Sequence, residues 1–214
     1  MQNTGILSAA PPAILDQEFV IDPYLPALAI IETQSAAQTF TVGMTGTLTR
    51  VDLQVLRDAK QSASPLVLEI RRTLVGGFPD ENITGRLAHL PITATLPPYI
   101  IAPPNLIQVE LGVQSLPVSA GDVLSISLNS MATRSEWYLW AGAWAPGSVG
   151  DMYDRGQGYF RSAFTGGVYR PMNGDLGFRT FVVPIPEPSS LVCSLVAAAA
   201  MLGTLRSSWR MRSQ

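Results

Sequence analysis

Apolar and polar residues alternate along much of the chain. The clearest alternation runs from Arg50 to Val55, where every second side chain is apolar, and it predicts a strand with one face in water. Other short apolar runs recur at roughly ten-residue spacing, separated by turns rich in Gly, Pro and Asp. Those between 37 and 183 predict strands near 37–43, 47–57, 65–76, 107–130 and 175–183. We therefore predict an all-β fold, a single jelly-roll-like β-sandwich followed by a C-terminal hydrophobic helix.

The length and charge of the chain narrow this prediction. Its 214 residues suit one domain with tails: an irregular lead-in over 1–30 with one strand near 18–21, a sandwich over 31–183 and a tail over 184–212. Charged residues make up only 14% of the chain and the formal net charge is -2. A protein that holds a phosphate backbone needs a dense basic face, so nucleic acid is not a predicted partner.

The residues that usually carry catalysis are scarce. His89 is the only histidine, and Cys193, the only cysteine, lies in the apolar tail, so no Cys-His pair or cysteine metal site is expected. We predict no catalytic site. The alternative is a secreted carbohydrate-active hydrolase that uses paired surface carboxylates, although the spacing singles out no pair. Its candidate acids are Glu110, Asp122, Glu136, Asp151, Asp154 and Asp175.

Aromatic residues gather between 137 and 159. Sugar rings stack on flat aromatic side chains, so we predict that Tyr138 and Trp140 lie exposed on a concave face, with Trp144 as a further stacking residue. In a strand Trp137 would point to the opposite face from these two. The alternative is that the rings fill the core of the sandwich. Extracellular polysaccharide is the ligand class that this hypothesis implies.

A weaker pattern points to a cation. Asp151 and Asp154 stand among glycines and could give oxygen ligands to a structural Ca²⁺, although the segment DMYDRGQG does not match an EF-hand loop. The alternative is an ordinary polar loop. No other metal or cofactor is predicted.

The C-terminal tail has three parts in a fixed order. Pro186, Glu187 and Pro188 come first, and an apolar run that includes Leu191, Leu195, Leu202 and Leu205 follows. The cluster Arg206, Arg210 and Arg212 ends the chain, as expected of residues that anchor a membrane helix on its cytoplasmic side. We predict a transmembrane helix over about 190–206, at the short end of the spanning range. The alternative is a buried helix with a solvated basic end.

This order of Pro-Glu-Pro, apolar helix and arginine cluster resembles the PEP-CTERM sorting signal. The resemblance covers about thirty residues and implies that exosortase, a membrane-embedded transpeptidase of Gram-negative bacteria, cuts near Pro186–Pro188. It implies a precursor anchored in the inner membrane and a product on the cell surface or in the extracellular matrix. The segments QTFTVG, TLTRVDLQV, AGDVLSISL and DLGFRTFVV resemble, in their order, domains that often precede this tail, which are thought to be jelly-roll sandwiches of unassigned activity.

The N-terminal residues differ from that pattern. Residues 1–19 have neither a basic leader nor a continuous apolar stretch, whereas family members carry a signal peptide, so we expect the natural start to lie upstream. Taken together, the sequence predicts an exported, surface-targeted structural or carbohydrate-associated protein that exosortase processes and that is linked to exopolysaccharide or a biofilm matrix.

Overall fold

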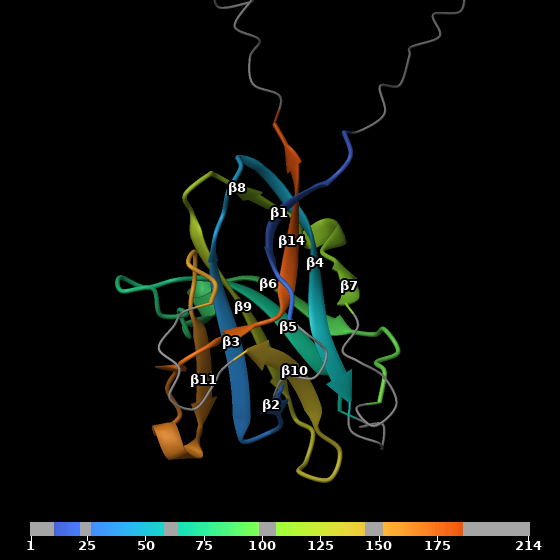
Figure 1. The fold of residues 1–214 in the computed structure, drawn as a ribbon, viewed down its shortest axis with the longest axis vertical. Helices are drawn as coiled ribbons and strands as arrows, with labels where there is room; N and C mark the ends of the chain where they lie inside the picture. Colours follow the sequence, from blue (N-terminus) through green and yellow to red (C-terminus); the bar gives the residue numbers. More distant parts are fainter. Residues whose placement is uncertain (1–10, 22–26, 58–63, 99–105, 144–151, 186–214) are drawn as a thin grey trace, which may run out of the picture. The chain divides into compact units, whose positions relative to one another are not determined.

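The computed structural model describes residues 11–21, 27–57, 64–98, 106–143 and 152–185. All the strands described there lie in the first unit of the chain, Met1–Pro184, and they form two antiparallel sheets (Figure 1). The helices of the described residues are three single 3-10 turns, η1 (Ile83–Gly85), η2 (Gly112–Gln114) and η3 (Ala163–Thr165). The predicted all-β sandwich is confirmed.

The larger sheet is built around its longest strand. β4 (Gly46–Arg57) pairs along one edge with β14 (Phe178–Pro184) and β10 (Tyr138–Ala143), and it also pairs with β7 (Leu106–Glu110) and β8 (Leu116–Val118). The remaining strands of this sheet are β1 (Ile14–Phe19), β2 (Ala27–Ile30) and β13 (Asp175–Leu176).

The second sheet has six strands in the order β12-β11-β3-β9-β5-β6. Their bounds are β12 (Arg170–Pro171), β11 (Gly158–Ser162), β3 (Gln34–Thr41), β9 (Val123–Ser130), β5 (Leu66–Arg72) and β6 (Arg86–Ile92). Neighbours such as β3 and β9 are far apart in sequence, so residues from many parts of the chain meet on each face of this sheet.

The hydrophobic core fills the space between the two sheets. In β9 the alternate residues Leu124, Ile126 and Leu128 are buried in this core. The rings of Phe40 from the six-stranded sheet and Phe178 from the eight-stranded sheet contact each other, with centroids 5.8 Å apart. Burial of such apolar side chains from both sheets stabilises the sandwich.

The N-terminal segment is more regular than predicted. β1 pairs with β14 from Ile14↔Val182 to Phe19↔Phe178, and β2 pairs with β10. An irregular lead-in over 1–30 with one strand near 18–21 was predicted, and the described residues give two strands, β1 and β2, to the eight-stranded sheet. The reason is that their backbone groups find partners on strands more than a hundred residues away, which local sequence patterns do not indicate.

The polar side of β4 is also less exposed than its alternation predicted. Asp52 and Gln54 are both buried. The Gln54 amide donates to the Ile21 carbonyl at 3.1 Å and its Oε1 accepts from the Ile21 N–H at 2.8 Å. Asp52 Oδ1 lies 3.0 Å from Arg50 Nε, and burial raises the pKa of this carboxyl. The alternation predicted the strand, but the polar face is covered by neighbouring segments rather than by water.

The predictions for the tail fall outside the described residues. They concern the Pro186–Pro188 motif, the helix over about 190–206 and the three arginines that follow it. Among the residues that the structure does describe, no helix has both the length and the apolar character to cross a membrane.

Candidate functional site

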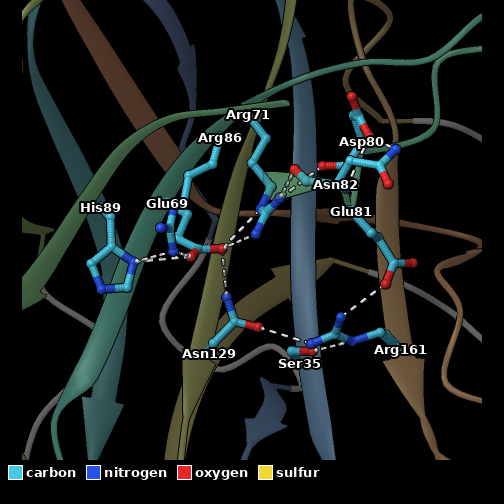
Figure 2. Close-up of polar contacts among 10 residues, drawn as sticks. All are labelled: Ser35, Glu69, Arg71, Asp80, Glu81, Asn82, Arg86, His89, Asn129 and Arg161. Carbon is cyan, nitrogen blue, oxygen red and sulfur yellow. Dashed lines mark hydrogen bonds and ion pairs between the residues drawn. The ribbon is translucent and has the colours of Figure 1, made fainter. Parts of the chain in front are cut away.

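Polar side chains gather on the outer face of the six-stranded sheet. Along β5 the core side chains Leu68 and Ile70 alternate with Glu69 and Arg71, so the two charged residues share the other face. The strand register places Glu69 opposite His89 on β6 and opposite Ser127 on β9. Residues of β3, β5, β6, β9 and β11 and of the β5–β6 loop meet there through hydrogen bonds and ion pairs (Figure 2).

Glu69 is the centre of this polar cluster. Its side chain is 7% exposed, and Arg71 Nη2 lies 2.7 Å from Oε2. Oε1 lies 3.2 Å from Arg86 Nη1 and 3.0 Å from His89 Nδ1, while Asn129 Nδ2 donates to Oε2 at 3.3 Å. Burial by itself would raise the pKa of Glu69, but hydrogen bonds from His89, Arg71 and Arg86 lower it below the usual range. The carboxylate is held in its charged form.

A second arginine is fixed beside this cluster. Arg161 on β11 donates from Nε to Ser35 Oγ at 3.0 Å and from Nη1 to Glu81 Oε2 at 2.9 Å. Its Nη2 donates to Asn129 Oδ1 at 3.3 Å. Because the Asn129 amide also donates to Glu69, it links the two ionic groups (Figure 2). The guanidinium planes therefore have set orientations.

The loop between β5 and β6 is tied to the sheet by the same residues. Arg71 Nη1 donates to the carbonyls of Asp80 and Asn82, at 2.8 Å and 3.2 Å. Glu81 Oε1 accepts from the Tyr169 N–H at 3.2 Å. These contacts hold the loop against β5 and against the segment before β12, so the loop forms one wall beside the polar cluster.

A cleft of about 340 Å³ opens above the cluster. Polar and aliphatic side chains share its lining, and half of the His89 side chain is exposed at its edge. This volume lies within the range of small-ligand sites, which combine apolar surface with a few fixed polar groups. The lining comprises Ile31, Glu32, Ser35, Pro65, Val67, Glu69, Arg71, Glu81, His89, Asn129, Ser130, Met131, Arg161 and Tyr169. Such a cleft can orient a polar ligand by hydrogen bonds.

Two of the three predicted sugar-stacking rings, Tyr138 and Trp140, lie neither in this cleft nor on an exposed face. Trp140 is 0% exposed and Tyr138 7%, so the prediction that both lie on an open concave face is wrong. β10 pairs with β2 and β4, and both rings join the hydrophobic core between the sheets. The third predicted residue, Trp144, lies outside the described residues.

None of the described carboxylates that were named for a hydrolase lines the cleft. Of the six, Asp151 lies outside the described residues, and the other five are absent from the lining of the cleft. Asp175 is buried between the sheets, and Asp122 accepts a hydrogen bond from the Ser119 N–H within its own turn. The acids that line the cleft are Glu32, Glu69 and Glu81, which the sequence analysis did not select. For Glu69 the sequence does hold a signal, because a residue of opposite charge, Arg71, stands two positions along the same strand and therefore on the same face.

The cation prediction has little support in the described part of the chain. There, no three or more His, Cys, Asp or Glu side chains are grouped so that they could hold a metal ion. Asp154 is exposed, and Asp151 falls in the segment 144–151, which the structure does not describe.

The charge of Glu69 should make the stability of the fold depend on pH. Near neutral pH, Glu69→Gln is expected to lower the free energy of unfolding by about 2 kcal/mol, because charged hydrogen bonds to two arginines are lost. The folded-state pKa lies below the ordinary value of 4.5, so the carboxylate stabilises the fold above pH 4.5. This contribution is lost as the pH falls through the folded-state pKa. Urea unfolding of both proteins should therefore show a difference that shrinks below pH 4.5.

A matched control is Glu110→Gln, because Glu110 is exposed at the end of β7. This variant should change the free energy of unfolding very little across the same pH series. A Glu69→Gln difference that stays constant or grows in acid would contradict the assigned direction of the pKa.

Comparisons with known proteins do not assign the chain to a family. No protein-family model matches it, and no curated protein matches its sequence. Its function has to be argued from its own residues.

Proposed function

We propose that this chain is an exported, non-catalytic surface protein that associates with carbohydrate through its β-sandwich and is processed by exosortase at its C-terminal tail. The sandwich is proposed to be jelly-roll-like, which its two antiparallel sheets and its long-range strand neighbours support. The proposed destination is the cell surface or an exopolysaccharide-rich matrix.

The cleft over Glu69 is the observation that carries the binding part of the proposal. Its guanidinium, carboxylate and amide groups are held by one another, so they present donors and acceptors in fixed directions beside the aliphatic side chains of Ile31 and Val67. Sugar hydroxyls both donate and accept, which matches such a mixed set of groups. Preorganised groups also lose little conformational freedom when a ligand binds.

The same geometry favours binding over glycoside hydrolysis. Hydrolysis needs a protonated carboxyl as general acid and a second carboxylate in reach of the sugar. The pKa of Glu69 is lowered rather than raised, and both Glu69 and Glu81 are paired with arginines. Carboxylates that are paired with arginines in this way orient the neighbouring side chains. They are poorly suited to donate a proton to a glycosidic oxygen.

The order of the tail residues carries the sorting part of the proposal. Proline at 186 and 188 removes two backbone donors from the motif, which disfavours regular helix or sheet in its sequence, and the apolar run and arginine cluster after it suit a membrane-anchored precursor. Exosortase and the inner membrane are the partners that this order implies.

The test is expression with a functional signal peptide and an epitope tag inserted at the exposed Val75, in hosts with and without exosortase. We expect a shortened, surface-located product only where exosortase is present. Replacement of Pro186, Glu187 and Pro188 by alanine should leave the full-length, membrane-bound form in both hosts. An unprocessed, soluble product of the wild-type chain in both hosts would overturn the sorting proposal.

A further inference from the structure

We propose that a second groove, between the β2–β3 turn, the turn before β10 and η3, binds a neutral saccharide ring by stacking on Trp137 and Phe164. This inference rests on the proposed association with carbohydrate and assigns a separate place to it. The groove has a volume of about 310 Å³ and is lined by Ala29, Ile31, Thr33, Gln34, Arg134, Trp137, Ser162, Ala163 and Phe164. In Figure 1 the three segments lie at the lower end of the view. Ile31 also lines the cleft over Glu69, so the two sites adjoin.

The strand geometry explains why Trp137 is available while its neighbours are not. Tyr138 and Trp140 join the core, whereas Trp137 stands one residue before β10 and is 37% exposed. Side chains one apart in an extended chain point in opposite directions, so the burial of Tyr138 turns Trp137 outward. The Trp137 indole thus lines the groove and is partly exposed to solvent.

Phe164 is exposed on η3, a turn that local hydrogen bonds fix. The side chain is 94% exposed, so an aromatic surface is open to solvent beside the groove. Yet η3 is closed by a capping box in which the Ser162 N–H donates to Thr165 Oγ1 at 2.9 Å. Gly166 and Gly167 follow with φ of 71° and 76°, the left-handed conformation that glycine adopts readily. The fold therefore fixes the backbone turn that carries this ring at the groove.

Polar groups with unused hydrogen-bonding capacity stand beside the two rings. Among the described residues Arg134 makes no ion pair or hydrogen bond. The Gln34 amide is oriented by donation from Nε2 to the Ala29 carbonyl at 2.7 Å, with its Oε1 left as an acceptor. One donor group and one acceptor beside aromatic surface match the hydroxyls and the C–H face of a sugar ring.

The charges nearby favour a neutral sugar over an acidic one. Glu32 lies in the same turn as Gln34, and Glu136 lies between Arg134 and Trp137. Among the described residues that line the groove, Arg134 is the one charged side chain, and these two acids, adjacent in sequence to lining residues, offset its charge, so no net positive charge selects a uronic acid. A volume at the low end of the small-ligand range suits one or two sugar rings of a longer chain.

The test uses the full chain with cellohexaose and mannohexaose as neutral probes and an alginate hexamer as the acidic probe. Binding is followed by isothermal titration calorimetry and by tryptophan fluorescence. We expect at least one neutral probe to bind more tightly than alginate, and both Trp137→Ala and Phe164→Ala to weaken it about tenfold. Phe164 is almost fully exposed, so its replacement should leave the fold unchanged if Trp137→Ala disturbs it. The matched control is Val113→Ala, an exposed apolar residue on η2.

The outcomes separate this inference from the proposed function. If the wild-type chain binds a neutral probe and neither ring variant weakens it while Arg161→Gln does, the groove is wrong and the cleft over Glu69 is the carbohydrate site. Tighter binding of alginate than of both neutral probes overturns the assignment of a neutral ligand. If no probe binds, both the groove and the proposed carbohydrate association fail, while processing by exosortase is still decided by its own experiment.

Discussion

Trp140→Ala is expected to lower the free energy of unfolding by about 4 kcal/mol. The indole is 0% exposed and lies in the main hydrophobic core, and its Nε1 donates to the Gly177 carbonyl at 2.9 Å. Truncation removes the buried ring and leaves a cavity between closely packed strands. Urea unfolding should show a much lower midpoint with an unchanged slope.

The neighbouring tryptophan gives a matched control. Trp137→Ala removes the same atoms from a site that is partly in water, so it should cost about 1 kcal/mol or less. Equal losses for the two variants would mean that the two rings are equally buried, and the assignment of Trp140 to the core would be wrong. Trp140→Phe should give an intermediate loss, because it keeps a ring but removes the donor to Gly177.

The strands of the body were predictable because their pattern is local. Apolar alternation and Gly- or Pro-rich turns located β3, β4, β5, β9 and β14, and short strands at even spacing indicated a sandwich. The burial of Tyr138 and Trp140 was not predictable in the same way. A period-two pattern shows that two rings share a face, and only the pairing of β10 with β2 and β4 decides whether that face meets solvent or the core.

The candidate cleft was missed for a related reason. Glu69, Arg86, Asn129 and Arg161 come from four strands, and their sequence separations reach ninety-two residues between Glu69 and Arg161. Each one alone resembles an ordinary polar residue on the exposed face of a strand. Strand order and register bring them together, and neither can be obtained from composition or spacing in one sequence.

Asp175 shows how a residue that was proposed for catalysis serves the fold instead. The side chain is 0% exposed and lies on β13 of the eight-stranded sheet. Its Oδ1 accepts from Gln38 Nε2 of the other sheet at 2.9 Å. Its Oδ2 accepts from the N–H groups of Met152 and Tyr153, at 3.0 Å and 3.1 Å. One carboxylate thus satisfies three donors, two of them buried, and links the two sheets.

Asp175→Ala is therefore expected to lower the free energy of unfolding by about 4 kcal/mol, since three donors, two of them buried, lose this acceptor at once. Asp175→Asn should cost about half as much, because its single oxygen can serve the backbone N–H groups while its amide then faces the donor Nε2 of Gln38. Gln38 cannot simply turn over, because its Oε1 already accepts from the Leu176 N–H at 2.8 Å. Urea unfolding of both variants measures these losses against Asp154→Ala, which removes an exposed carboxylate. An Asp175→Asn variant as stable as wild type would show that the fold does not depend on an acceptor that faces Gln38 Nε2.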